Sequence, residues 1–184
     1  MKISLIGYRA SGKSTLGGEL SRRLGLPLLD IDRGIEARFP NETLTELWLR
    51  IGDPRFREIE AEVVEEMCAG DECVISFGAG TLGRPENRRH ACRDALVVYL
   101  EMSAEGLWER MQVDPRNAST RPNLAGGGLQ EVVEMLARRD PVYRECADLL
   151  VDASLPTERL ADIVIAELEA RRQPGPNSAD QFQR

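Results

Sequence analysis

This chain of 184 residues lacks an apolar run long enough to cross a membrane. The longest apolar stretch near its middle, Ala95 to Leu100, is far shorter than the roughly 20 residues that a spanning helix needs. The amino-terminal residues also lack the apolar segment and small-residue cleavage site of a secretory signal. These features predict a cytoplasmic protein without a membrane partner.

Positive charge and aromatic rings are scarce as well. The chain has 24 Lys+Arg against 31 Asp+Glu, a net charge of -7, and its two lysines are Lys2 and Lys13. Four Phe, three Tyr and two Trp offer few rings on which bases could stack. The sequence therefore argues against a nucleic-acid partner, and any anionic ligand needs a local basic site.

Cysteine and histidine do not form a recognisable metal-binding pattern. The four cysteines contain no C-x2-C pair, and His90 is the one histidine that could join them. We predict that the cysteines are reduced packing residues. They are Cys68, Cys73, Cys92 and Cys146.

The remaining composition is typical of a globular domain, with 42% hydrophobic and 30% charged residues. Short apolar runs alternate with segments of helical periodicity, which predicts an α/β fold. The predicted strands cover residues 3–6, 28–30, 73–77, 96–100 and 149–151. The predicted helices are a segment carrying Leu16, Leu20 and Leu24, and residues 44–51, 54–68, 104–111, 129–143 and 157–172.

This alternation predicts a mostly parallel sheet, because parallel strands need crossover connections that place helices on both faces. Ligands in such folds bind at the carboxyl ends of the strands. The candidate ligand-binding residues therefore follow the predicted strands. They are Gly7 to Ser14, Asp30 to Asp32, Gly78 to Gly80 and the segments after Leu100.

One segment interrupts the alternation and one follows it. Residues 112–128 contain two prolines, three consecutive glycines and arginines that include Arg121. A mobile basic lid is predicted there, with an ordinary flexible connection as the alternative. Residues 173–184 are polar and contain two prolines, which predicts a disordered tail after a single domain at 1–172.

A phosphate-binding loop is predicted between the first strand and the first helix, where the chain reads Gly7-Tyr8-Arg9-Ala10-Ser11-Gly12-Lys13-Ser14. This matches the pattern G-x4-G-K-[ST]. The glycines let the backbone curl around phosphates, and the helix amino terminus favours anions. Lys13 would supply a positive charge and Ser14 a ligand for Mg²⁺. An ordinary glycine-rich turn is the alternative.

Two aspartates end the second predicted strand. Asp30 and Asp32 are one residue apart, so their side chains would point the same way in an extended segment. One carboxylate could reach Mg²⁺, while the other could accept a hydrogen bond from the hydroxyl that attacks the terminal phosphate. Alternatively, Asp32 caps the following helix.

Two arginines are candidates for binding a carboxylate, because a planar guanidinium can form two parallel hydrogen bonds with it. Arg57 lies three residues before Glu60, which could orient it on one helical face. Arg139 precedes an Asp-Pro-Val-Tyr segment. Solvated surface charges are the alternative for both. Gly78-Ala79-Gly80 could bring backbone amides close to a ligand, or could be a tight strand exit.

Taken in order, these motifs resemble the shikimate kinase family, a group of small P-loop kinases related in fold to nucleoside monophosphate kinases. The resemblance covers residues 3–168. The matching segments are Gly-Tyr-Arg-Ala-Ser-Gly-Lys-Ser-Thr, Asp-Ile-Asp, Phe-Arg-Glu-Ile-Glu, Gly-Ala-Gly, Thr-Arg-Pro-Asn-Leu and Arg-Arg-Asp-Pro-Val-Tyr. Their ordered combination is more specific than any one of them.

The resemblance implies a P-loop NTPase three-layer α/β/α fold with a five-stranded parallel sheet, a substrate-binding region at residues 32–62 and a lid at 112–128. It also implies transfer of the ATP γ-phosphate to the 3-hydroxyl of shikimate, giving shikimate 3-phosphate and ADP in the chorismate pathway of aromatic amino-acid biosynthesis. Mg²⁺ is the implied cofactor, and a monomer is the implied state.

The resemblance also assigns roles to individual residues. The implied catalytic residues are Lys13, Asp32 and Arg121. ATP would be bound by Gly7, Ala10, Ser11, Gly12, Lys13, Ser14, Thr15, Arg110 and Arg121. Shikimate would be bound by Asp32, Arg57, Gly78, Ala79, Gly80 and Arg139. The metal would be organised by Ser14 and Asp30.

The chain departs from the usual family pattern in the lid, where Arg-Pro-Asn-Leu stands for the more apolar Arg-Pro-Leu-Leu, and at two positions near the acceptor site. The family usually has three consecutive glycines where this chain has Ala79 in the middle, and Ala79 would be strained if that position required a positive φ. Trp48 lies in a region that often carries Phe and would change the wall of the substrate pocket.

Two other hypotheses follow from the same residues. The chain could be a related kinase that acts on another small hydroxylated acid or polyol, or a nucleotide-binding protein without productive transfer. Asp32, Arg57 and Arg139 argue against the second hypothesis, because a nucleotide switch has no evident need for a second anion site.

Overall fold

A five-stranded, fully parallel sheet forms the centre of the computed structural model, which describes residues 1–113 and 128–172. The strands follow one another across the sheet in the order β2-β3-β1-β4-β5. They are β1 (Lys2–Ile6), β2 (Leu28–Asp30), β3 (Val74–Ser76), β4 (Ala95–Glu101) and β5 (Leu149–Asp152). The predicted parallel α/β fold is therefore confirmed.

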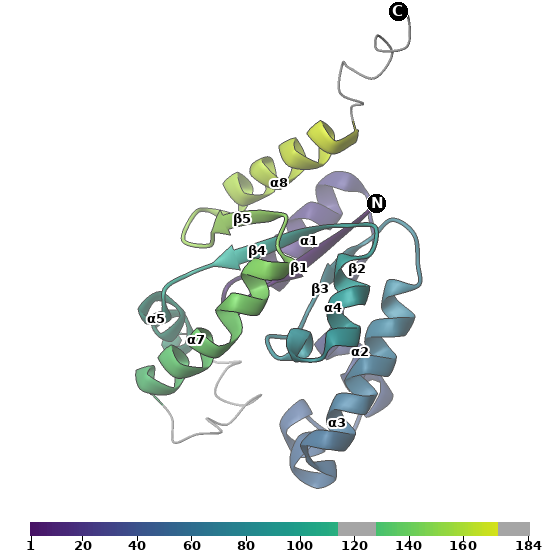
Figure 1. Cartoon of the computed structure of the whole chain (residues 1–184), viewed down its shortest axis with the longest axis vertical. Coiled ribbons are helices and arrows are strands. Elements are labelled where there is room, and N and C mark those ends of the chain that lie inside the picture. The colour runs from purple at the N-terminus through teal and green to yellow at the C-terminus, as the bar shows by residue number, and fades with distance from the viewer. Residues whose placement is uncertain (114–127, 173–184) are drawn as a thin grey trace, which may run out of the picture.

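Helices cover both faces of this sheet. Helices α1 and α8 pack on one face, whereas α3, α4 and α7 pack on the other (Figure 1). The helices are α1 (Lys13–Leu24), α2 (Ile31–Arg38), α3 (Leu44–Cys68), α4 (Pro85–Cys92), α5 (Ala104–Val113), α7 (Leu129–Cys146) and α8 (Thr157–Arg172), with a short 3₁₀ helix η1 (Thr81–Gly83). No helix among these described segments is long and apolar enough to cross a membrane.

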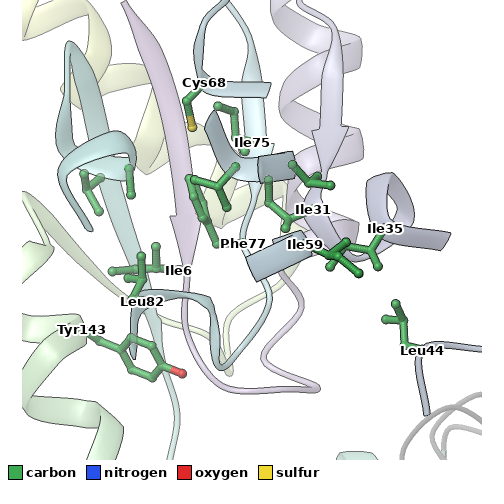
Figure 2. Close-up of a cluster of buried hydrophobic side chains, with 14 of the residues drawn as sticks. Ile6, Ile31, Ile35, Leu44, Ile59, Cys68, Ile75, Phe77, Leu82 and Tyr143 are labelled. Atoms are coloured by element: carbon green, nitrogen blue, oxygen red, sulfur yellow. The ribbon is translucent and has the colours of Figure 1, made fainter. Parts of the chain in front are cut away.

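The side chains of β4 show how one strand serves both faces. Leu96 and Val98 point into the core beneath α1 and α8, whereas Val97 and Tyr99 point into the core beneath α3, α4 and α7. Alternate residues of a strand face opposite sides, so a central strand must be apolar on both. Figure 2 shows the second of these cores, with Tyr143 of α7 at one side of it.

The predicted strands agree with the observed ones to within a residue at each end, but two helices were missed. Helix α2 is short and begins directly after β2, with only Ile31 and Ile35 buried. Helix α4 buries only Asn87 and Ala91, so it lacks the apolar periodicity that indicates a helix. The break predicted between residues 51 and 54 is present as a kink at Gly52, where φ is 76°.

The register of the sheet brings three strand ends together. Asp30 of β2 pairs with Ser76 of β3, and Ser76 pairs with Leu5 of β1. The chain therefore leaves these three neighbouring strands at one edge of the sheet. The phosphate loop, the two aspartates and the Gly78 to Gly80 turn all begin at this edge.

Candidate active site

The phosphate loop curls between β1 and α1 with both of its glycines in the left-handed region. Gly7 has a φ of 142° and Gly12 a φ of 97°, and α1 begins at the next residue, Lys13. A Cβ at Gly7 would lie 2.9 Å from the carbonyl oxygen of Leu100. The amino terminus of α1 therefore faces the space that the loop encloses, and its N–H groups favour an anion there.

Lys13 is held over this loop by backbone carbonyls. Its Nζ donates hydrogen bonds to the carbonyl oxygens of Gly7 and Tyr8, over 2.9 and 2.7 Å, and the side chain is only 8% exposed. A buried ammonium group needs such acceptors because it has lost its water. Lys13 thus places a fixed positive charge on the loop beside the helix terminus.

The other predicted nucleotide-binding residues surround this charge. Ala10 adopts a φ of 63°, which is unusual for a residue other than glycine, and Ser11 is buried. Ser14 and Thr15 are exposed in the first turn of α1. Arg110 of α5 donates to the carbonyl oxygen of Ser11 over 3.3 Å, and also to that of Ala153 over 2.6 Å. Arg110 therefore joins the phosphate loop to the segment after β5.

Ser14 and Asp30 meet across the ends of α1 and β2. The Ser14 hydroxyl donates to Oδ2 of Asp30 over 3.0 Å. The other oxygen of Asp30 accepts a hydrogen bond from the backbone N–H of Arg33 and caps α2. A hydroxyl and a carboxylate beside a phosphate loop are hard oxygen donors of the kind that Mg²⁺ prefers.

Asp32 does not lie in an extended segment with Asp30, so that part of the sequence analysis is wrong. Helix α2 begins at Ile31 because the side chain of Asp30, and not that of Asp32, caps it. Asp32 lies in the first turn of α2, with its carboxylate against Gly78. A Cβ at Gly78 would be 2.6 Å from Oδ1 of Asp32, so the turn after β3 is shaped to receive this carboxylate.

Arg57 of α3 is fixed by two carboxylates and is not a solvated surface charge. Its Nη1 lies 2.9 Å from Oε2 of Glu60, which is 2% exposed, and its Nε lies 3.3 Å from Oδ1 of Asp53. Burial alone lowers the pKa of Arg57. The nearby charge of Glu60 and the hydrogen bond with it raise that pKa, and Asp53 raises it further in the same two ways, so that the net pKa lies above its ordinary value. The guanidinium therefore stays charged.

The partners of this arginine extend the network in two directions. The Thr81 hydroxyl donates to Oε1 of Glu60 over 2.9 Å, so both oxygens of this buried carboxylate are satisfied. The indole Nε1 of Trp48 donates to Oδ1 of Asp53 over 3.1 Å. Helical spacing linked Arg57 to Glu60 in the sequence, but Asp53 and Thr81 were missed. Asp53 lies four residues before Arg57, so the same helical spacing could have found it. No local pattern connects Thr81 to this network.

The Gly78 to Gly80 turn packs directly on the arginine side chain. A Cβ at Gly80 would lie 3.0 Å from Nη1 of Arg57 and 3.1 Å from its Nη2. Ala79 does not have a positive φ, so the strain considered for this position is not present. The carbonyl oxygen of Ala79 accepts a hydrogen bond of 2.6 Å from the Tyr143 hydroxyl, which anchors the turn to α7.

Arg139 and Arg57 line the same cavity. It has a volume of about 340 Å³ and lies between η1, α3 and α7. The remaining lining residues are Ala79, Gly80, Leu82, Gly83, Arg84, Arg138, Val142 and Tyr143. The Cζ atom of Arg139 lies 5.4 Å from the ring centroid of Tyr8, so this acceptor-side arginine touches the phosphate loop. The cavity and the loop are therefore neighbours.

Some of the sequence-predicted features fall outside the described residues. Arg121 and the tail at 173–184 are among them, as is the lid apart from its ends. Gln112 and Val113, at the start of the predicted lid, belong to helix α5. What the sequence predicts for Arg121, the lid and the tail stays a prediction.

Residues 9–169 match the family model of shikimate kinase. The chain belongs to the shikimate kinase family. The shikimate kinase of Oleidesulfovibrio alaskensis is 38% identical over 170 residues, which cover 92% of this chain and 98% of that relative. The shikimate kinase of Cereibacter sphaeroides is 34% identical over 171 residues, covering 92% of this chain and 83% of that relative.

A solved structure agrees with this family assignment. Shikimate kinase from Acinetobacter baumannii in complex with shikimate matches with a TM-score of 0.85 at 27% identity, covering 94% of this chain and 95% of that one. The family member described here therefore shares the fold of an enzyme whose structure holds shikimate.

Proposed function

We propose that this family member transfers the γ-phosphate of ATP to the 3-hydroxyl of shikimate, giving shikimate 3-phosphate and ADP. The observation that carries the proposal is the position of Arg57 and Arg139 on one cavity beside a phosphate loop. A carboxylate held by two guanidinium groups next to bound phosphates suits an acceptor that is both an acid and an alcohol.

On the acceptor side, the two arginines would bind the carboxylate and Asp32 would orient the hydroxyl. The carboxylate of Asp32 borders the Gly78 to Gly80 turn, whose backbone also faces the region of Arg57. A carboxylate at this place can accept the hydroxyl proton as the new phosphate ester forms. Gly78, Ala79 and Gly80 would contribute backbone N–H groups to the acceptor site and a backbone shape that fits closely against Asp32 and Arg57.

On the nucleotide side, the residues act by positioning and charge. The loop from Gly7 to Thr15 would cradle the phosphates, and Lys13 would neutralise charge that develops during transfer. Arg110 donates to the carbonyl oxygen of Ser11 in this loop and is proposed to lie against the nucleotide base. Arg121 is proposed to contribute a further positive charge to the transferring phosphate.

Ser14 and Asp30 are suited to hold Mg²⁺. Their oxygens are 3.0 Å apart beside the loop, and both are donors of the type that Mg²⁺ prefers. When bound with ATP, Mg²⁺ neutralises phosphate charge and fixes the geometry of the phosphates. We also propose that the enzyme is monomeric and cytoplasmic.

Release of ADP by the purified protein tests this function directly. The protein is assayed with ATP and Mg²⁺ in the presence of shikimate, gluconate, a panel of polyols or no acceptor. We expect shikimate-dependent turnover that is lost in Lys13→Ala and in Asp32→Asn. The matched control is Glu58→Gln, an exposed residue of α3 that pairs with Arg55 on the surface, and it should retain wild-type turnover.

The same assay distinguishes the other hypotheses. Turnover with gluconate or a polyol, but not with shikimate, would identify a related kinase with another acceptor. ATP binding without turnover on any acceptor would identify a nucleotide-binding protein. Either result would contradict the proposed acceptor.

A further inference from the structure

Tyr8 belongs to the phosphate loop, but its side chain contacts an arginine of the acceptor cavity. Its ring lies beside the guanidinium of Arg139, with 5.4 Å between Cζ of the arginine and the ring centroid. The ring is 3% exposed and packs in a cluster that includes Leu107 of α5 and Val132 of α7. Two helices therefore hold this ring in place.

A contact on the face of a guanidinium differs from an ion pair at its edge. An aromatic ring attracts the positive charge and fixes the plane of the group without using its N–H donors. Arg57 instead directs its Nη1 and Nε toward Glu60 and Asp53. A guanidinium that is held by a ring in this way keeps its N–H fork for a bidentate bond with a carboxylate.

The backbone of Tyr8 takes part in the nucleotide side of the site. Its carbonyl oxygen accepts a hydrogen bond of 2.7 Å from Nζ of Lys13 and one of 3.3 Å from the N–H of Ser11. A single residue therefore contacts the lysine of the phosphate loop and an arginine of the acceptor cavity. Phosphoryl transfer depends on close alignment of donor and acceptor, so a contact that links the two sides bears on that alignment.

We propose that Tyr8 is a positioning residue that holds Arg139 by its aromatic face and so sets where the acceptor carboxylate lies relative to the phosphate loop. This inference rests on the proposed function, because the carboxylate concerned is that of shikimate. The part of Tyr8 that matters is the ring, and not its hydroxyl.

Two substitutions distinguish the effect of the aromatic ring from the effect of filling the same apolar space. Tyr8→Leu keeps an apolar side chain in the cluster but removes the aromatic face, and we expect the KM for shikimate to rise about tenfold. The KM for ATP should change by less than about threefold, because Lys13 bonds to the backbone of Tyr8 and not to its ring. The kcat should fall, because the acceptor is then less well aligned with the phosphate. Tyr8→Phe retains the ring and should behave as wild type.

A control and a double-mutant cycle exclude a merely structural effect. Trp108 is partly buried against the same cluster, and Trp108→Leu should lower stability without raising the KM for shikimate. In an Arg139→Ala background, Tyr8→Leu should change that KM by less than about twofold, because the ring then has no guanidinium to orient.

Three outcomes would overturn the proposal while leaving the function intact. They are an unchanged KM for shikimate in Tyr8→Leu, equal rises in the KM for shikimate and ATP, and full additivity in the Arg139→Ala background. Failure of the wild-type protein to turn over shikimate would overturn the proposed function and this inference together. The wild-type assay therefore separates the two kinds of failure.

Discussion

The phosphate loop and the acceptor cavity fix their positive charges by different means. Lys13 is held by carbonyl oxygens of Gly7 and Tyr8, its own neighbours in the chain. Arg57 is held by two carboxylates of its own helix, and one of them, Glu60, also accepts a hydrogen bond from Thr81. Arg139 is held by the ring of Tyr8, which comes from a distant part of the sequence. The first side of the site depends on local backbone geometry. The second combines helical spacing around Arg57 with packing between distant segments, which brings Thr81 to Glu60 and Tyr8 to Arg139.

The largest expected effect concerns the lysine of the phosphate loop. Lys13→Ala should lower kcat by about 100-fold or more, because a preorganised positive charge acts mainly in the transition state. Shikimate binding, measured by calorimetry without nucleotide, should stay within about twofold of wild type, because Lys13 serves the nucleotide side. A large loss of shikimate binding would show that the two sides are not separable in this way.

The chain offers one other lysine as a matched control. Lys2 is also buried and donates to the carbonyl oxygen of Cys68 over 2.6 Å, but it lies at the start of β1, away from the phosphate loop. Lys2→Met should change the thermal stability and leave kcat unchanged. A loss of turnover comparable to that of Lys13→Ala would contradict a specific role for the loop lysine.

A smaller effect is expected at the buried carboxylate of the acceptor side. Glu60→Gln removes the charge that holds Arg57 and weakens the bond from Thr81, so the free energy of unfolding should fall by about 1–3 kcal/mol. The KM for shikimate should rise about tenfold, with the KM for ATP little changed. Urea unfolding and steady-state kinetics measure the two quantities, and Glu58→Gln is the exposed control on the same helix.

The turn after β3 tests the close approach between backbone and arginine. Gly80→Ala places a Cβ about 3.0 Å from Nη1 of Arg57 and should displace the guanidinium by a few tenths of an ångström. We expect the KM for shikimate to rise about fivefold, since misplacement of a binding group by fractions of an ångström weakens recognition. Ala79→Gly should leave that KM unchanged, because Ala79 has no positive φ and its backbone already fits. Equal effects of the two changes would argue against contact with Arg57 as the cause.

The smallest effect is expected within the phosphate loop, at Ala10. Its φ of 63° is costly for an alanine, so Ala10→Gly should raise the free energy of unfolding by about 0.5–1 kcal/mol, after the greater entropy of the unfolded glycine chain is allowed for. Asp94, which lies outside the site, has a φ of 54°. Asp94→Gly should raise the free energy of unfolding by less than Ala10→Gly does, because aspartate tolerates this conformation better than alanine. Thermal unfolding measures both changes, and a destabilised Ala10→Gly protein would contradict the argument.

The sequence predicted the parts of the site that depend on neighbours in the chain. The spacing of Gly7, Gly12 and Lys13 after an apolar strand is sufficient to predict a phosphate loop, because those glycines and the helix start make its geometry locally. The helical spacing of Arg57 and Glu60 likewise predicted their contact. The predicted extended arrangement of Asp30 and Asp32 was wrong, because a strand pattern does not show where a capping side chain starts the next helix.

The tertiary structure decided which distant residues complete the site. The packing of η1 against α3 buries Glu60 and brings Thr81 to it, and the packing of α7 beside the phosphate loop places Arg139 against Tyr8. No periodicity or motif encodes these contacts, because each depends on the angle and register at which two separate elements pack. The sequence alone therefore determined the strands, the phosphate loop and the ion pair of Arg57 with Glu60. The burial of Glu60 against Thr81 and the position of Arg139 against Tyr8 were decided only when the helices packed on the sheet.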